Sequence, residues 1–345
     1  MFGHLATKHS VSNLLALTLT GVAICTFFMG IIPSHAQIGI LAPLLLILLK
    51  SIQGIFASGE HSLAALFVLE HVEDDKKCGK ASSYYLCSTM AGTMLASLAA
   101  TLVSRSLDPT FYWRIAYITG LLTAIAGIWL RLTIQYKAPD SMDLSKNSFT
   151  SINLHKTTLI KVIVVNGFSF LTYTLPFVFL NSFIPLFTNI KTDELLAHNT
   201  ILVTIDIMLL PIFGMFIDKF NYSKWMAIMS FLLTVTIIPL FLSLPNLDIM
   251  QITYVKFWIL VIGVAFVAPL NAWLFQMIKG NIKYLINGFG YALGTELLGR
   301  NIPVICLILW EYTHTLVAPA LYIAFICLLT TIVLVIDVIY TKSKN

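Results

Sequence analysis

The feature that most constrains this chain is a series of long, almost unbroken apolar segments. Each holds about 20 or more mostly apolar residues, the length that a helix needs to cross a bilayer. Only helices and closed β-barrels satisfy their backbone polar groups within lipid. Barrel strands alternate apolar and polar residues, and these segments do not alternate. The chain is therefore predicted to be an all-α polytopic membrane protein.

The composition agrees with this class. Hydrophobic residues make up 58% of the 345 residues and charged residues only 11%, whereas soluble domains carry about 25% charged residues. The net charge of +5 comes from scattered bases, so the expected surroundings are a lipid bilayer and no nucleic acid is expected as a partner. The five cysteines include no CxxC pair, so the sequence predicts no metal site.

Ten membrane-spanning helices are predicted. They cover residues 14–32, 39–69, 83–103, 112–132, 159–187, 198–217, 225–243, 253–278, 285–310 and 316–339. The one long polar connection lies between the fourth and the fifth. It divides the chain into an N-terminal bundle of four helices at 1–132, a central loop at 133–158 and a C-terminal bundle of six helices at 159–345.

The positions of Lys and Arg orient these helices. With ten spans both termini share one side, and most Lys and Arg residues lie on that side. The opposite side holds only Arg105, Arg114, Lys191 and Lys256. Cytoplasmic loops carry an excess of Lys and Arg, so both termini are predicted to be cytoplasmic.

The second predicted helix carries polar residues that need a reason to lie in lipid. Lys50 and Gln53 are three residues apart and share a helix face. Glu60 follows toward the cytoplasmic end. One interpretation is a polar stripe that lines a solute pathway, and the other is a structural ion pair with a packing seam. The sequence leaves both open.

Three more charges lie in later spans. Asp206, near the middle of the sixth, could bind and release a proton in a transport cycle or could pair with a neighbouring helix. Glu296 and Arg300 are four residues apart in the ninth, an order that favours a helical ion pair. An unpaired Arg300 could instead anchor a carboxylate, because the guanidinium fork matches its geometry.

The loop after the sixth predicted helix carries a motif. It reads Gly214-Met215-Phe216-Ile217-Asp218-Lys219 and resembles the short cytoplasmic loop signature of the major facilitator superfamily. In that family the Asp caps or pairs with a neighbouring helix end and helps to hold one conformation. The usual Gly-Arg that follows is replaced here by Asn221-Tyr222.

Other segments narrow the resemblance to one branch. Lys50-Ser51-Ile52-Gln53-Gly54 with Ser58-Gly59-Glu60 is similar to the fourth helix of the metabolite:proton symporters, a branch that includes bacterial proline/betaine transporters. Trp113-Arg114-Ile115 and Gly290-Tyr291 resemble later helices of the same branch. Lys50 departs from it, because Arg is usual there. The resemblance covers essentially the whole chain.

The resemblance implies a major facilitator fold and symport of a small osmolyte or metabolite with protons, by alternating access, in the bacterial inner membrane. A proton is the implied coupling ion, and no cofactor is expected. The candidate solute or proton pathway residues are Lys50, Gln53, Glu60, Asp206, Glu296 and Arg300, and the loop-motif residues are Gly214, Asp218 and Lys219. No nucleophile-elbow, zinc-protease or P-loop motif occurs, so an enzyme is not expected.

The resemblance also exposes a difference from the family. The fold usually has two bundles of six helices, and the pattern here is four and six. Gly3-His4-Leu5-Ala6-Thr7-Lys8 resembles the first copy of the loop motif with Thr7 at the Asp position, so the first two helices are expected to be missing. The alternative function is therefore a non-transporting truncated remnant, or a split-gene fragment completed by a separate polypeptide that supplies two helices.

Overall fold

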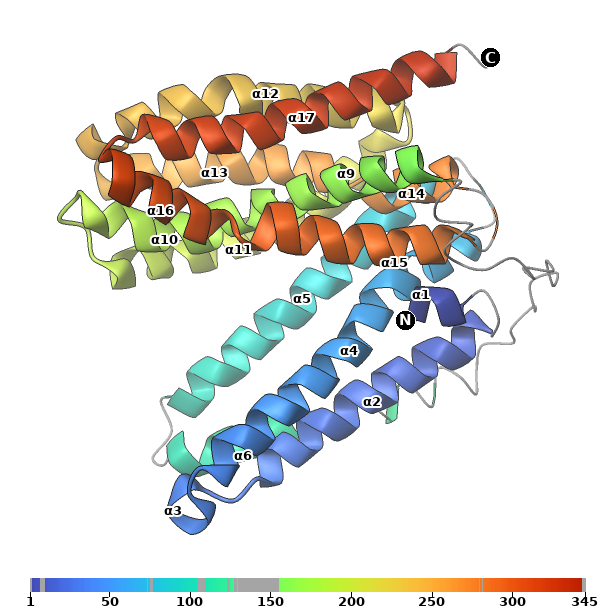
Figure 1. The fold of residues 1–345 in the computed structure, drawn as a ribbon, viewed down its shortest axis with the longest axis vertical. Coiled ribbons are helices and arrows are strands. Elements are labelled where there is room, and N and C mark those ends of the chain that lie inside the picture. Colours follow the sequence, from blue (N-terminus) through green and yellow to red (C-terminus); the bar gives the residue numbers. More distant parts are fainter. Residues whose placement is uncertain are drawn as a thin grey trace. The chain divides into compact units, whose positions relative to one another are not determined.

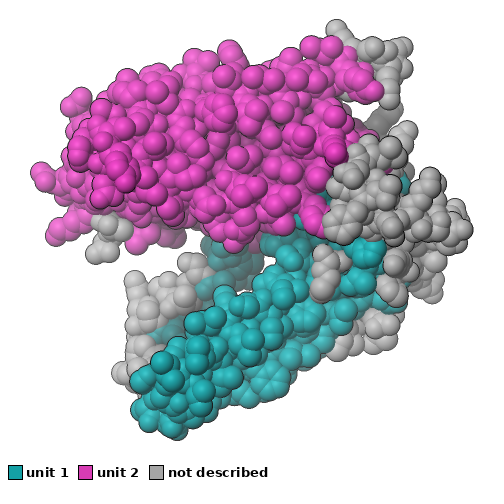
Figure 2. Space-filling view, viewed as in Figure 1, with its two compact units in different colours: residues 1–67, 91–151, 280–288 teal, residues 68–90, 152–279, 289–345 magenta. Residues whose placement is uncertain are grey.

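The computed structural model describes residues 2–6, 10–72, 74, 77–104, 109–122, 125–126, 129, 155–278, 280 and 282–342. Within these ranges the chain consists of helices and connections, without strands (Figure 1). The chain divides into two compact units, which Figure 2 colours separately. Unit 1 comprises residues 1–67, 91–151 and 280–288, and unit 2 comprises residues 68–90, 152–279 and 289–345. The predicted central loop at 133–158 lies almost entirely outside the described residues, so the three-part division stays a prediction.

The described residues contain eight helical segments that are long and apolar enough to cross a membrane. They are Val11–Ile31, Leu41–Glu70, Lys156–Leu186, Glu194–Ile217, Tyr222–Asn246, Ile249–Met277, Ile282–Thr313 and Val317–Tyr340, and they correspond to eight of the ten predicted spans. The predicted span at 83–103 lies inside α5 (Cys78–Ser104), a helix of 27 residues. The predicted span at 112–132 overlaps α6 (Pro109–Ile118), and beyond that helix the structure describes only residues 119–122, 125–126 and 129 of it.

Unit 1 is built from the first helices of the chain. It contains α1 (Phe2–Leu5), α2 (Val11–Ile31), α3 (His35–Ile38), most of α4 (Leu41–Glu70), the end of α5, α6 and the start of α15 (Ile282–Gly294). α2 packs against α6. Arg114 of α6 donates hydrogen bonds to the carbonyls of Gly30 and Ile32. A helix leaves its last carbonyls without internal partners, so Arg114 caps the end of α2.

Unit 2 contains most of the remaining helices. They are α9 (Lys156–Thr174), η2 (Leu175–Phe179), α10 (Leu180–Phe183), η3 (Ile184–Leu186), α11 (Thr192–Ile217), α12 (Tyr222–Ser243), η4 (Leu244–Asn246), α13 (Ile249–Val267), α14 (Leu270–Met277), the end of α15, η5 (Thr295–Arg300), α16 (Ile302–Thr313) and α17 (Val317–Lys342). α12 packs along α17, and the Thr331 hydroxyl donates to the Ser230 hydroxyl across that contact at 2.9 Å. Small polar residues of this kind let membrane helices approach closely.

A cluster of aromatic rings packs inside unit 2. Phe179, Phe183 and Phe241 are fully buried. The Phe179 and Phe183 ring centroids lie 4.7 Å apart, and the Trp310 ring lies edge-on to Phe183 at 5.4 Å. Such ring pairs add to the stabilisation that comes from burial alone. The cluster joins η2 and α10 to α12 and α16.

Two of the spans are interrupted by π-helical turns, and each turn has a proline nearby. η2 contains Pro176, and η5 is followed by Pro303. Proline cannot donate the backbone hydrogen bond that an α-helix requires, and wider turns of this kind occur where that ladder is interrupted. α9 packs closely on η5. A Cβ at Gly294 would lie only 3.0 Å from the backbone nitrogen of Gly167, so this approach requires glycine.

Candidate functional site

The predicted loop motif covers the last turn of α11 and the start of the connection to α12, and Asp218 meets the N-terminus of α5. The Asp218 carboxylate accepts hydrogen bonds from the backbone N–H groups of Gly79 at 2.7 Å and Lys80 at 3.0 Å. It also accepts one from the Tyr222 hydroxyl at 2.7 Å. The first N–H groups of a helix lack internal partners and carry partial positive charge. Asp218 therefore caps α5, the kind of contact that the resemblance implies.

Two glycines allow this close approach. A Cβ at Gly79 would lie 2.5 Å from an Asp218 carboxylate oxygen, and a Cβ at Gly214 would lie 2.5 Å from the Ser83 Cβ. Lys219 is exposed, and its ammonium lies 6.0 Å from the Phe216 ring centroid. Gly214 and Asp218 thus take part in the contact with α5, whereas Lys219 stays at the surface.

The candidate residues of α4 lie in unit 1. The Lys50 ammonium donates to the Gln53 side-chain oxygen at 3.1 Å, and the Gln53 amide donates to the Thr26 hydroxyl of α2 at 2.7 Å. Lys50 and Gln53 therefore lie on the same face of α4 and contact each other directly. Glu60 is half-buried and makes no hydrogen bond or ion pair with another described residue.

Asp206 lies in apolar surroundings in unit 2. Leu202 and Leu210, one turn away on either side in α11, are buried in a cluster with α13. Asp206 itself is only 7% exposed. Among the described residues, no hydrogen-bond or ion-pair partner faces the carboxylate.

Glu296 and Arg300 face each other on η5. The shortest distance between the guanidinium and the carboxylate is 2.6 Å, and both side chains are more than half exposed. The Arg300 guanidinium also lies over the Phe170 ring, 5.3 Å from its centroid. In this structure Arg300 therefore has a carboxylate partner within its own helix.

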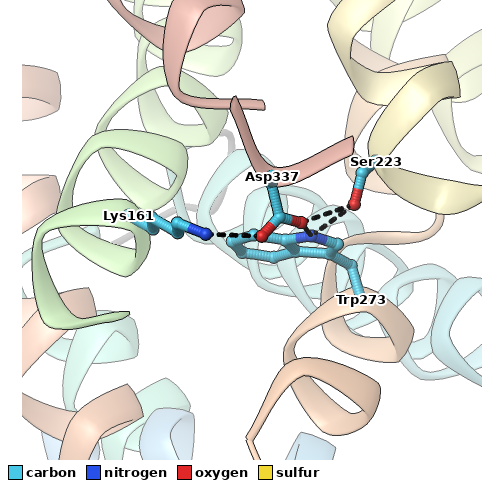
Figure 3. Close-up of polar contacts among 4 residues, drawn as sticks. All are labelled: Lys161, Ser223, Trp273 and Asp337. Atoms are coloured by element: carbon cyan, nitrogen blue, oxygen red, sulfur yellow. Dashed lines mark hydrogen bonds and ion pairs between the residues drawn. The ribbon is translucent and has the colours of Figure 1, made fainter. Parts of the chain in front are cut away.

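A polar cluster that the sequence did not single out joins four helices of unit 2 (Figure 3). Asp337 of α17 lies between Lys161 of α9, at 2.6 Å, and the Ser223 hydroxyl of α12, at 2.7 Å. The Trp273 indole of α14 donates to Ser223 at 3.0 Å and to Asp337 at 3.2 Å. A signal for this cluster was the lone Asp337 in a strongly apolar segment, because such charges usually have partners.

A second cluster that was missed surrounds Lys256. The sequence analysis counts Lys256 with the bases on the side opposite the termini, and that orientation stays a prediction. The structure shows that the Lys256 side chain, in α13, lies inside unit 2 and is 0% exposed. The ammonium donates to the side-chain oxygens of Asn181 at 2.7 Å and Asn199 at 2.5 Å. The cluster thus joins α10, α11 and α13 through one buried cation.

The amino-acid sequence matches a known protein family. The family model described as Major Facilitator Superfamily matches residues 1–295. The chain belongs to the major facilitator superfamily. It is therefore a membrane protein of a transporter family and not an enzyme, which confirms the predicted fold class and the predicted absence of catalysis.

The similar proteins fit this family. The chain is 27% identical to the proline/betaine transporter of Salmonella typhimurium, with 95% of this chain and 69% of that protein aligned. It is 26% identical to the glycine betaine/proline/ectoine/pipecolic acid transporter of Dickeya dadantii, with 95% and 69% aligned.

Solved structures support the fold. A crystal structure of the fucose:proton symporter of E. coli gives a TM-score of 0.70 at 12% identity, covering 96% of this chain and 85% of that chain. A D-xylose-proton symporter gives a TM-score of 0.60 at 15% identity, covering 96% and 83%.

Proposed function

We propose that this major facilitator protein is a symporter that moves a small osmolyte such as proline or a betaine together with protons, by alternating access. The observation that best supports this solute class is the alignment of almost the whole chain with transporters named for proline and betaine. Secondary transporters place their solute sites near the bilayer midplane and expose them in turn to each side.

Asp206 is the proposed proton site. A buried carboxylate without a partner is costly when charged, and Asp206 has none among the described residues. Binding of a proton removes that cost. Protonation can therefore be coupled to movements of α11 against the apolar residues around it.

The cap on α5 supports the conformational part of the proposal. Asp218 holds the α11–α12 loop against residues 79 and 80 through charge-assisted hydrogen bonds. An alternating-access carrier needs contacts that hold one conformation and are released in another. Asp218 supplies such a contact.

The decisive experiment is uptake by liposomes that contain only this protein. We expect an imposed inward proton gradient to drive accumulation of labelled glycine betaine or proline. Asp206→Asn removes the titratable group and should abolish gradient-driven uptake while exchange of solute across the membrane persists. The matched control is Glu311→Gln, which changes an exposed carboxylate in α16 and should leave uptake unchanged. Uptake of neither solute by the wild-type protein would contradict the proposal.

We further propose a bacterial inner-membrane location with both termini cytoplasmic. A reporter enzyme that is active only in the cytoplasm should then be active when it is fused after residue 145. A reporter that is active only outside the cytoplasm should be inactive at the same position. If the protein alone fails to transport and a co-expressed two-helix segment restores uptake, the split-gene alternative is favoured instead.

A further inference from the structure

Lys256 is a buried cation without an anionic partner among the described residues. Its side chain is fully buried, and its two hydrogen-bond partners are neutral amide oxygens. Burial of an ammonium group costs several kcal/mol unless an opposite charge compensates it. The two amides satisfy hydrogen bonds but carry no net charge, so the site lacks a counter-ion.

The cluster of Lys256, Asn181 and Asn199 also contains N–H groups that donate to no described residue. An ammonium group has three N–H bonds, and Lys256 uses two of them on the described residues. The Asn199 amide NH2 shares a carbon with the oxygen that Lys256 contacts, so it lies beside the cation, and it donates to no described residue. The Asn181 amide NH2 already donates one hydrogen bond, to the Phe177 carbonyl at 2.6 Å.

A positive charge beside unused N–H donors is the chemistry that recognises a carboxylate. We propose that Lys256 and the amide of Asn199 bind the carboxylate group of the transported solute. This assignment rests on the proposed function and names the part of the solute that the site recognises. The Lys256 side chain is fully buried here, so the proposal requires that α10 or α11 moves away from α13 to admit the solute.

The competing explanation is that Lys256 only ties three helices together. Two variants separate these explanations. Lys256→Met removes the charge and the ammonium donors and keeps most of the length of the unbranched side chain. Asn199→Asp places a carboxylate at the oxygen position 2.5 Å from the ammonium, so it supplies an internal counter-ion that occupies the proposed site and keeps the helices joined.

The test is equilibrium binding of labelled glycine betaine to the purified protein, with unlabelled betaine and choline as competitors. Choline has the same trimethylammonium group but a hydroxyl in place of the carboxylate. We expect the wild-type protein to prefer betaine over choline. Each variant should weaken betaine binding by about 10-fold or more and should abolish that preference. Asn199→Asp should do so without lowering the melting temperature.

The outcomes distinguish the two levels of the proposal. Wild-type protein that binds neither betaine nor proline contradicts the proposed function and this assignment together. Betaine binding and preference that persist in Asn199→Asp contradict the carboxylate site alone and favour the structural role. If Lys256→Met does not fold, Asn199→Asp decides the question.

Discussion

The Asp337 cluster gives the sharpest stability prediction, for the substitution Asp337→Asn. The side chain keeps its size, and its remaining oxygen can still accept a hydrogen bond from Ser223 or Trp273. The ion pair with Lys161 at 2.6 Å is lost. The four residues of the cluster belong to four different helices. The substitution therefore removes an interaction between helices, which contacts within one helix do not replace.

The magnitude follows from burial. The Lys161 and Asp337 side chains are only 20% and 11% exposed. Removal of one partner from a buried ion pair costs about 3–5 kcal/mol, because the other charge stays buried. We expect about 3 kcal/mol, since neither side chain is fully buried. At about 2–4 °C per kcal/mol for a unit of this size, the melting temperature should fall by about 6–12 °C.

The assay is thermal unfolding of the purified protein in detergent. The control is Asp74→Asn, which makes the same chemical change in an ion pair with Lys77 whose side chains are 46% and 68% exposed, where a pair contributes about 0–1 kcal/mol. Lys161→Met with Asp337→Asn should cost less than the sum of the two single changes. The reasoning is refuted if the Asp337→Asn variant has the same melting temperature as the wild-type protein. It is also refuted if the cost of the double variant equals the sum of the costs of the two single variants.

Two further predictions concern the cap on α5. Asp218→Asn removes the charge that meets the Gly79 and Lys80 N–H groups, so hydrogen exchange at these two amides should be at least about 10-fold faster; unchanged exchange would contradict the cap. Gly79→Val should lower the melting temperature by several degrees, because a Cβ would lie 2.5 Å from the Asp218 carboxylate, whereas Gly54→Val, with no heavy atom within 4 Å of its Cβ, should not. An equal fall in melting temperature for both variants would show that the close approach at Gly79 does not contribute to stability.

The membrane helices were predictable because the bilayer imposes a length and a composition on each of them. Pairs close in sequence were predictable too. Lys50 and Gln53 are three residues apart, Glu296 and Arg300 four, and helix geometry alone places such residues side by side.

The clusters that join separate helices were not predictable in the same way. Lys161 and Asp337 are 176 residues apart, and Lys256 and Asn181 are 75 apart. Periodicity tells which residues share a face of one helix but not which helix that face meets. Lys256 shows the consequence, because the sequence gives no sign that Asn181 and Asn199 surround its ammonium.

The most direct measurement of the central claim follows the proton itself. A pH-sensitive dye inside liposomes that contain the protein reports acidification when glycine betaine is added outside. We expect acidification that depends on betaine in the wild-type protein and is absent in Asp206→Asn. Betaine entry without any pH change, or acidification that persists in Asp206→Asn, would contradict the account.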